Sequence, residues 1–256
     1  MSGAGIDLGR SDVASLSDRE RQDEVIRYLA DARVRQSHTH TAPIAAEEAE
    51  KAGKFARFLA RRYYRDRLHR SCRYSFLIAP QAAAEQVVDS AEFDAFLDQC
   101  ALGSLESAVV VRDLALQRLG EIAAPGAWWR EVLVYQGAFF LQAATSGRGD
   151  AKEMPRRGHS AVCLDFDWAI PQVLDRLKRG AAVDDSLRRP ATLVFSRTAE
   201  GRIYVMEADA AAAAVFKALK PGIDVERIAG IPATVARETL ASLAAIGAAV
   251  IDPVTR

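Results

Sequence analysis

The spacing of apolar residues changes near residue 150, and this change constrains the fold more than any other feature of the sequence. Before it, apolar side chains recur every three or four residues, as on a helix with one face in a core. After it, residues 192–197 and 202–207 form two strand-like runs around a four-residue spacer that ends in Gly201, which is typical of a β-hairpin. The sequence therefore predicts an α+β protein: an N-terminal all-helical domain followed by a small winged-helix-like α+β domain.

The predicted helical domain covers residues 1–150 and holds about four or five helices. Its Gly-, Ser- and Asp-rich start, residues 1–15, is expected to be disordered. The helix over residues 104–123 is apolar on most faces, so we expect it to be the central helix of the bundle. A longer helix begins near residue 45, and its apolar positions at helical spacing are Ala52, Phe55, Leu59 and Tyr63.

The second predicted domain covers residues 158–256. Residues 146–159, rich in Gly, Pro and charged side chains, are the predicted linker. A strand near residues 160–166 and the hairpin precede three short helical segments, which is the element order of a winged helix. The expected core residues of this domain are Phe216, Leu219, Ile228, Leu240, Leu243 and Val250.

Charge and cysteine content narrow the function classes. The 34 basic and 34 acidic residues cancel, which argues against general binding to nucleic acid or a membrane surface. Three widely spaced cysteines indicate free thiols in a reducing compartment. Residues 1–9 lack a secretory signal, and no stretch approaches the ~20 apolar residues of a membrane helix. We expect a soluble cytoplasmic protein.

The residues that carry chemistry form no recognisable catalytic motif. The sequence has no Gly-x-Ser-x-Gly, no Cys-x-x-Cys and no phosphate-binding loop. His38 and His40 lie in a predicted loop without further ligands at metal-binding spacing. We therefore expect no metal site, no cofactor in this chain and no catalysis by this chain alone.

The C-terminal segment resembles the PqqD-type recognition element of pathways that make ribosomally synthesised, post-translationally modified peptides (RiPPs). Met206-Glu207 replaces the usual Leu-Asn, Pro221-Gly222 stands in for Asp-Gly, and the segment after Ile228 is shorter than usual. The matching residues are 201–207 (GRIYVME), Ala211, Val215, Phe216, Leu219, 225–229 (VERIA), Leu240, Leu243, Ile246, Gly247 and Val250.

The whole chain resembles the partner subunits of multinuclear non-heme iron-dependent oxidases of RiPP biosynthesis. The resemblance rests on the order of FARFLARRYYRDRL, LGSLESA, WWREVLVYQGAFFLQA, FDWAIPQVL and the tail described above. It implies a non-catalytic partner that binds the leader of a ribosomal precursor peptide and presents its core to the oxidase. The iron is then expected in the oxidase subunit.

Two surfaces are candidates for binding, one from this resemblance and one from the charge pattern. A leader that adds a strand to an exposed sheet edge gains main-chain hydrogen bonds there. The candidate peptide-binding residues are Ile203, Tyr204, Val205, Met206, Glu207, Val235, Arg237, Glu238 and Thr239; simple core packing is the alternative for Tyr204 and Met206. The seven arginines between residues 57 and 73 form either a solvated face with local salt bridges or an interface, with an acidic partner or nucleic acid as its ligand. The candidate partner-interface residues are Arg57, Arg61, Arg62, Tyr64 and Arg65.

A winged-helix DNA-binding transcription factor is the alternative function. A recognition helix needs side chains for base edges and cations for phosphates. The helix predicted over residues 233–246 offers only Arg237, beside Glu238, and residues 223–246 carry more acidic than basic side chains. The peptide-binding hypothesis is therefore preferred.

Overall fold

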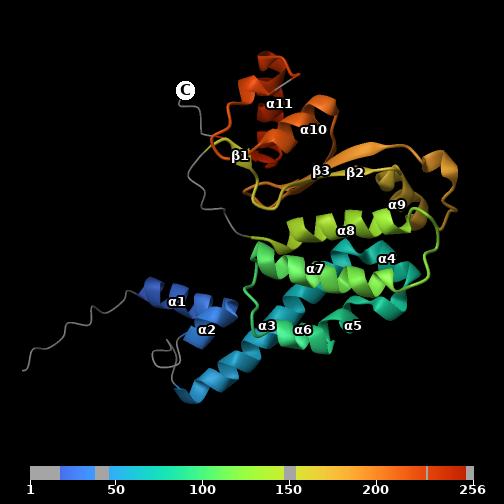
Figure 1. Cartoon of the computed structure of the whole chain (residues 1–256). Helices are drawn as coiled ribbons and strands as arrows, with labels where there is room; N and C mark the ends of the chain where they lie inside the picture. Colours follow the sequence, from blue (N-terminus) through green and yellow to red (C-terminus); the bar gives the residue numbers. More distant parts are fainter. Residues whose placement is uncertain (1–17, 38–45, 147–153, 229, 252–256) are drawn as a thin grey trace, which may run out of the picture.

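The computed structural model describes residues 18–37, 46–146, 154–228 and 230–251. It confirms the α+β class: a helical first half is followed by a three-stranded antiparallel sheet with helices (Figure 1). The prediction for residues 1–15 lies outside the described residues. No helix in the described ranges is both long and apolar enough to cross a membrane.

The first half consists of helices of very different lengths. Ser90 and Ser104 cap two of them, because their hydroxyl oxygens accept hydrogen bonds from the amides of Phe93 and Ser107. The elements are α1 (Asp18–Ala30), α2 (Ala32–Ser37), α3 (Ala46–Ser71), α4 (Arg73–Ile78), η1 (Pro80–Ala82), α5 (Ala84–Val88), α6 (Ala91–Phe96), α7 (Leu105–Gly120) and α8 (Trp129–Ala144).

The buried stripe of α3 differs from the expected one. Phe55 is 51 % exposed, whereas the buried apolar positions along the helix are Ala56, Ala60, Tyr64 and Leu68. Both stripes have helical spacing, so periodicity alone does not choose between them. The observed stripe begins with alanines, which let α3 approach its neighbours closely.

The sequence analysis expected α7 to be the central helix, but the central helix is α8. Val110 on α7 is 41 % exposed, whereas ten of the sixteen residues of α8 are buried. The physical reason is the position of α8: Figure 1 shows it between the other helices of the first half and the sheet. Its residues accordingly belong to two core clusters, with Phe140 in one and Val132 in the other.

The sheet has the order β2 (Val162–Phe166), β3 (Ala191–Arg197) and β4 (Ile203–Glu207), and all pairs are antiparallel. Phe195 lies opposite Val162 and Val205, and this row faces α8. Val194 lies opposite Cys163 and Met206, and this row faces the C-terminal helices. Both faces of the sheet are therefore covered, as Figure 1 also shows.

The C-terminal helices form the layer beyond the sheet. They are α10 (Ala210–Ala218), η3 (Val225–Arg227) and α11 (Ala233–Ala245); α9 (Ile170–Lys178) and η2 (Asp185–Leu187) connect β2 to β3. Of the expected core residues, Phe216, Leu219 and Leu243 are buried, and Ile228 and Leu240 pack against them while partly buried. Val250 is half-buried in a strand.

The predicted linker contains a paired strand. Within residues 146–159, β1 (Arg156–Arg157) pairs with β5 (Ala249–Val250). The prediction that this whole segment is a linker is therefore wrong at Arg156–Arg157. Charged residues were taken to indicate an unpaired linker, but Arg157 has partners: its Nε donates to the carbonyl of Phe216 at 3.1 Å.

The two halves also share a core. Trp129 and Val132 of α8 belong to one buried cluster with Ile170, Leu193 and Phe195 from beyond residue 150. The sheet is thus held by the helical half on one side and by α10 and α11 on the other.

Candidate functional site

The outer edge of β4 is the first candidate site. Within the described residues β4 pairs only with β3. Two hydrogen bonds fix which backbone groups this pairing uses: the amide of Thr198 donates to Arg202 O at 2.9 Å, and the amide of Ala208 donates to Thr192 O at 2.8 Å. Because hydrogen-bonded pairs alternate along an antiparallel ladder, the backbone groups of Ile203, Val205 and Glu207 point to the outer edge.

The two faces of β4 have different surroundings. The side chains of Ile203 and Val205 lie on the face toward α8, because their β3 partners Arg197 and Phe195 do. Tyr204 and Met206 lie on the other face; Met206 packs against the α10–α11 cluster, and Tyr204 is 36 % exposed. Core packing therefore accounts for Met206 more fully than for Tyr204.

The candidate residues on α11 divide between two flanks of the helix. Val235 and Thr239 are one turn apart and share a flank; Val235 is 38 % exposed. Arg237, two residues from each, points elsewhere: its Nε lies 3.5 Å from Glu226 Oε1 in η3. Glu238 is exposed. Val235 and Thr239 therefore share a flank of α11 to which Arg237 does not belong.

Two residues of the predicted partner interface already have acidic partners within the chain. Arg57 contacts Asp94 at 2.9 Å and Asp98 at 2.5 Å, and Arg61 also pairs with Asp94. The hydrogen bond from Arg57, together with the charges of both arginines, lowers the pKa of Asp94. These two arginines connect α3 to α6 and the residues just after it. This agrees with the alternative in which the arginine run forms local salt bridges.

The prediction that Tyr64 belongs to a partner interface is wrong. It is fully buried, with its ring centroid 6.1 Å from that of Phe93 and 6.4 Å from that of Phe140. Burial raises the pKa of its hydroxyl. A partner has no access to this side chain. Arg62 is exposed and Arg65 half-buried, so these two stay available on the outer side of α3.

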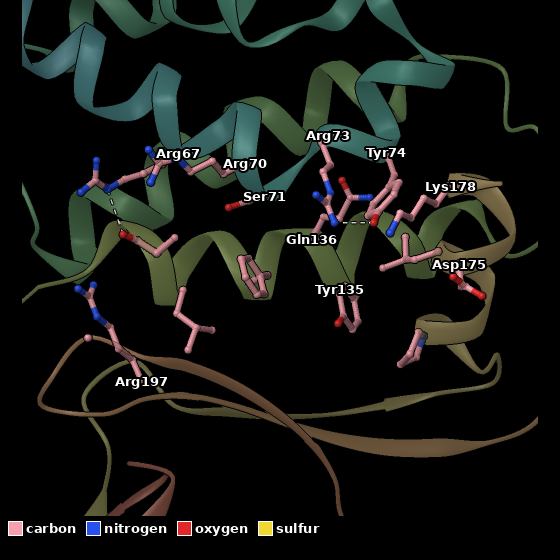
Figure 2. A pocket seen from close by; sticks show the side chains of 16 residues that line it. Arg67, Arg70, Ser71, Arg73, Tyr74, Tyr135, Gln136, Asp175, Lys178 and Arg197 are labelled. Atoms are coloured by element: carbon pink, nitrogen blue, oxygen red, sulfur yellow. Dashed lines mark hydrogen bonds between the residues drawn. The ribbon is translucent and has the colours of Figure 1, made fainter. Parts of the chain in front are cut away.

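A second candidate site, missed in the sequence analysis, lies beside α8. Arg67, Arg70 and Arg73, at the other end of the arginine run, border a cavity of about 720 Å³ together with Lys178 of α9 and Arg197 of β3. Figure 2 shows these side chains around a floor formed by α8, with Tyr135 and Gln136 on it. The arginine run 57–73 is recognisable in the sequence. That its last arginines lie beside Lys178 and Arg197 depends on the tertiary fold, so the sequence does not predict it.

The described residues contain no group of three or more His, Cys, Asp or Glu side chains that could hold a metal ion. His38 and His40 lie outside the described residues. Cys72, Cys100 and Cys163 are free thiols, and burial raises the pKa of Cys72 to about 12 and that of Cys100 to about 11. A nucleophilic thiolate is therefore not formed at either of these two positions at neutral pH.

No protein-family model matches the chain, and no curated protein matches it. The two sites described above are therefore the grounds for a functional proposal.

Proposed function

We propose that this chain is the non-catalytic partner subunit of a multinuclear non-heme iron-dependent oxidase of RiPP biosynthesis. In this role it binds the leader of a ribosomal precursor peptide and presents the core for modification. The iron belongs to the oxidase, this chain needs no cofactor, and the complex works in the cytoplasm, in keeping with the free cysteines.

The outer edge of β4 is the observation that supports this proposal. Ile203, Val205 and Glu207 direct main-chain donors and acceptors outward, and an extended peptide satisfies such groups by adding a strand. Tyr204, itself on β4, supplies exposed apolar surface for its side chains. Each main-chain hydrogen bond contributes about 0.5–1.5 kcal/mol net, so a few bonds with such contacts give useful affinity.

The DNA-binding alternative has weaker support. On α11, Arg237 is paired with Glu226 and followed by Glu238. A recognition helix with one neutralised cation has little attraction for phosphates. Sequence-specific nanomolar binding of duplex DNA would overturn the peptide-binding proposal.

The first test is at Glu207. This residue is exposed, and its amide points to the outer edge, so proline here removes an outward donor and leaves the bonds to β3 in place. The probe is the short peptide encoded beside the gene for this chain, labelled and titrated by fluorescence anisotropy. We expect Glu207→Pro to weaken binding by about tenfold, equivalent to 1.4 kcal/mol.

Glu207→Ala is the matched control, because it removes the same side chain but keeps the amide. We expect it to bind within about twofold of wild type, since exposed substitutions change little. Equal affinities of the Pro and Ala variants, both with wild-type circular dichroism spectra, would show that the peptide does not pair with β4. A gene neighbourhood without an oxidase and a short peptide would contradict the assigned pathway.

A further inference from the structure

The cavity beside α8 holds more positive charge than its surroundings neutralise. Asp175 is the one carboxylate among the described lining residues, and it already pairs with Arg179 at 2.6 Å. The five lining cations named above form no ion pair within the described residues. Their charge is therefore available to a ligand.

Two of these cations are held in place by neutral groups. Arg67 Nε donates to Ala143 O at 3.0 Å, and its guanidinium lies over the Tyr63 ring. Arg197 donates to Gln142 O at 3.1 Å and to Thr145 O. Hydrogen bonds to carbonyl oxygens position the guanidinium groups without cancelling their charge. In a concave site with low-dielectric walls, such charges concentrate the electrostatic field on an anion.

The cavity adjoins the outer edge of β4. Gly201 and Ile203 form part of its wall, and Ile203 is one of the residues whose backbone points outward. A strand added beside Ile203 directs every second side chain to the face of the sheet that looks toward α8. Those side chains would point toward the cavity that the cations of α3, α4 and α9 line; Figure 2 shows these cations.

We propose that this cavity recognises carboxylate side chains of the peptide segment that lies beside Ile203. The inference rests on the proposed function and adds the chemistry of its substrate: an acidic residue at alternate positions of the bound strand. A cavity of about 720 Å³ accommodates a few side chains but no nucleic-acid duplex. A single-stranded nucleic acid would leave the outer backbone groups of β4 unpaired, so the peptide fits more of the observations.

The probes are three labelled ligands titrated against the full chain at physiological salt. They are a synthetic octapeptide of alternating Glu and Val, the same peptide with Gln for Glu, and a single-stranded oligodeoxythymidylate. We expect the Glu peptide to bind at least about tenfold more tightly than the Gln peptide. Equal binding of the two peptides would overturn the proposal, and so would tighter binding of the oligonucleotide than of the Glu peptide.

Two double variants locate the binding. Arg70→Glu with Lys178→Glu reverses two exposed cavity cations that form no hydrogen bond or ion pair within the described residues. Arg21→Glu with Lys220→Glu makes the same change in net charge at exposed positions, on α1 and after α10, that do not line the cavity. We expect the first pair to weaken Glu-peptide binding at least about tenfold and the second less than twofold, because salt screens distant charges. Equal effects would overturn the cavity assignment.

Glu207→Pro separates this inference from the proposed function. If Glu207→Pro weakens binding of the Glu peptide and the cavity pair does not, strand addition stands and the cavity assignment fails. If the cavity pair weakens binding and Glu207→Pro does not, the cavity recognises carboxylates, but the strand addition of the proposed function is contradicted.

Discussion

Tyr64 and Phe55, on the same helix, show how closely two alternative apolar stripes compete. The sequence places aromatic side chains on both, and a shift of one residue turns the stripe by about 100° around the helix axis. In α3 the buried stripe carries Tyr64 and Leu68, and Phe55 faces outward. The long arginine side chains beside the buried stripe reach α6 and the cavity. A run of one residue type thus serves several separate contacts.

The first prediction concerns these two aromatic residues. Tyr64→Ala should lower the free energy of unfolding by about 3–5 kcal/mol, as other large-to-small core substitutions of aromatic residues do. Phe55→Ala, at a 51 % exposed position on the same helix, should change it by less than about 0.5 kcal/mol. Urea denaturation followed by circular dichroism gives both values. Similar losses for the two variants would contradict the assignment of the stripes.

At the scale of elements, one turn joins three segments. Gly247 ends α11 with a φ of +76°, and a Cβ added there would lie 2.4 Å from Arg197 O at the end of β3. The carbonyl of the same glycine lies against Gly158, next to β1. Ser196 on β3 donates its hydroxyl to Ile246 O at 2.8 Å. The end of α11, the hairpin and the β1 segment are therefore fixed against one another.

A glycine pair tests this junction. Gly180, after α9, also has a positive φ, of +64°, but open space around its Cβ position, so Gly180→Ala should cost only the left-handed backbone penalty of about 1–2 kcal/mol. Gly247→Ala adds a clash with backbone and should cost roughly 3 kcal/mol or more. Chemical denaturation compares the two. A smaller loss at Gly247 than at Gly180 would be incompatible with the close packing.

At the scale of the whole molecule, polar contacts reinforce the shared core. Gln142 of α8 exchanges hydrogen bonds with Ser160, and Glu131 accepts from the amides of Asp167 and Trp168. All three of these partners lie beyond residue 150. The sequence analysis divided the chain near residue 150 because the composition changes there. A change in composition does not predict which helices cover which face of a sheet.

We therefore predict that the chain unfolds in one transition. Tryptophan fluorescence and far-ultraviolet circular dichroism should give coincident urea midpoints, although the three tryptophans lie around α8 and β2 only. A fragment of residues 154–256 should lack a cooperative transition, because the Leu193 and Phe195 face of its sheet loses α8. Two separated midpoints, or a fragment that folds alone, would instead support two independent domains.

The sequence allowed the fold class, the hairpin and most helices to be predicted, because these depend on local periodicity and on turn and capping residues such as Gly201 and Ser104. The edge strand of the candidate site was found for the same reason. The cavity was not, because Arg67, Lys178 and Arg197 become neighbours only through tertiary packing. The burial of Tyr64 was missed for that reason as well, and the identity of Asp94 as the partner of Arg57 also depends on tertiary packing.

The pairing of β1 with β5 has a consequence for the order of folding. The sheet β2–β3–β4 joins strands that follow one another along the chain, whereas β1 and β5 come from opposite ends of the second half. Loop-closure entropy delays distant contacts relative to local ones, so the two-residue β1–β5 ladder forms after the sheet and the helices. Its few amides should also exchange with solvent deuterium before those of β3, through local opening that leaves the remaining structure intact.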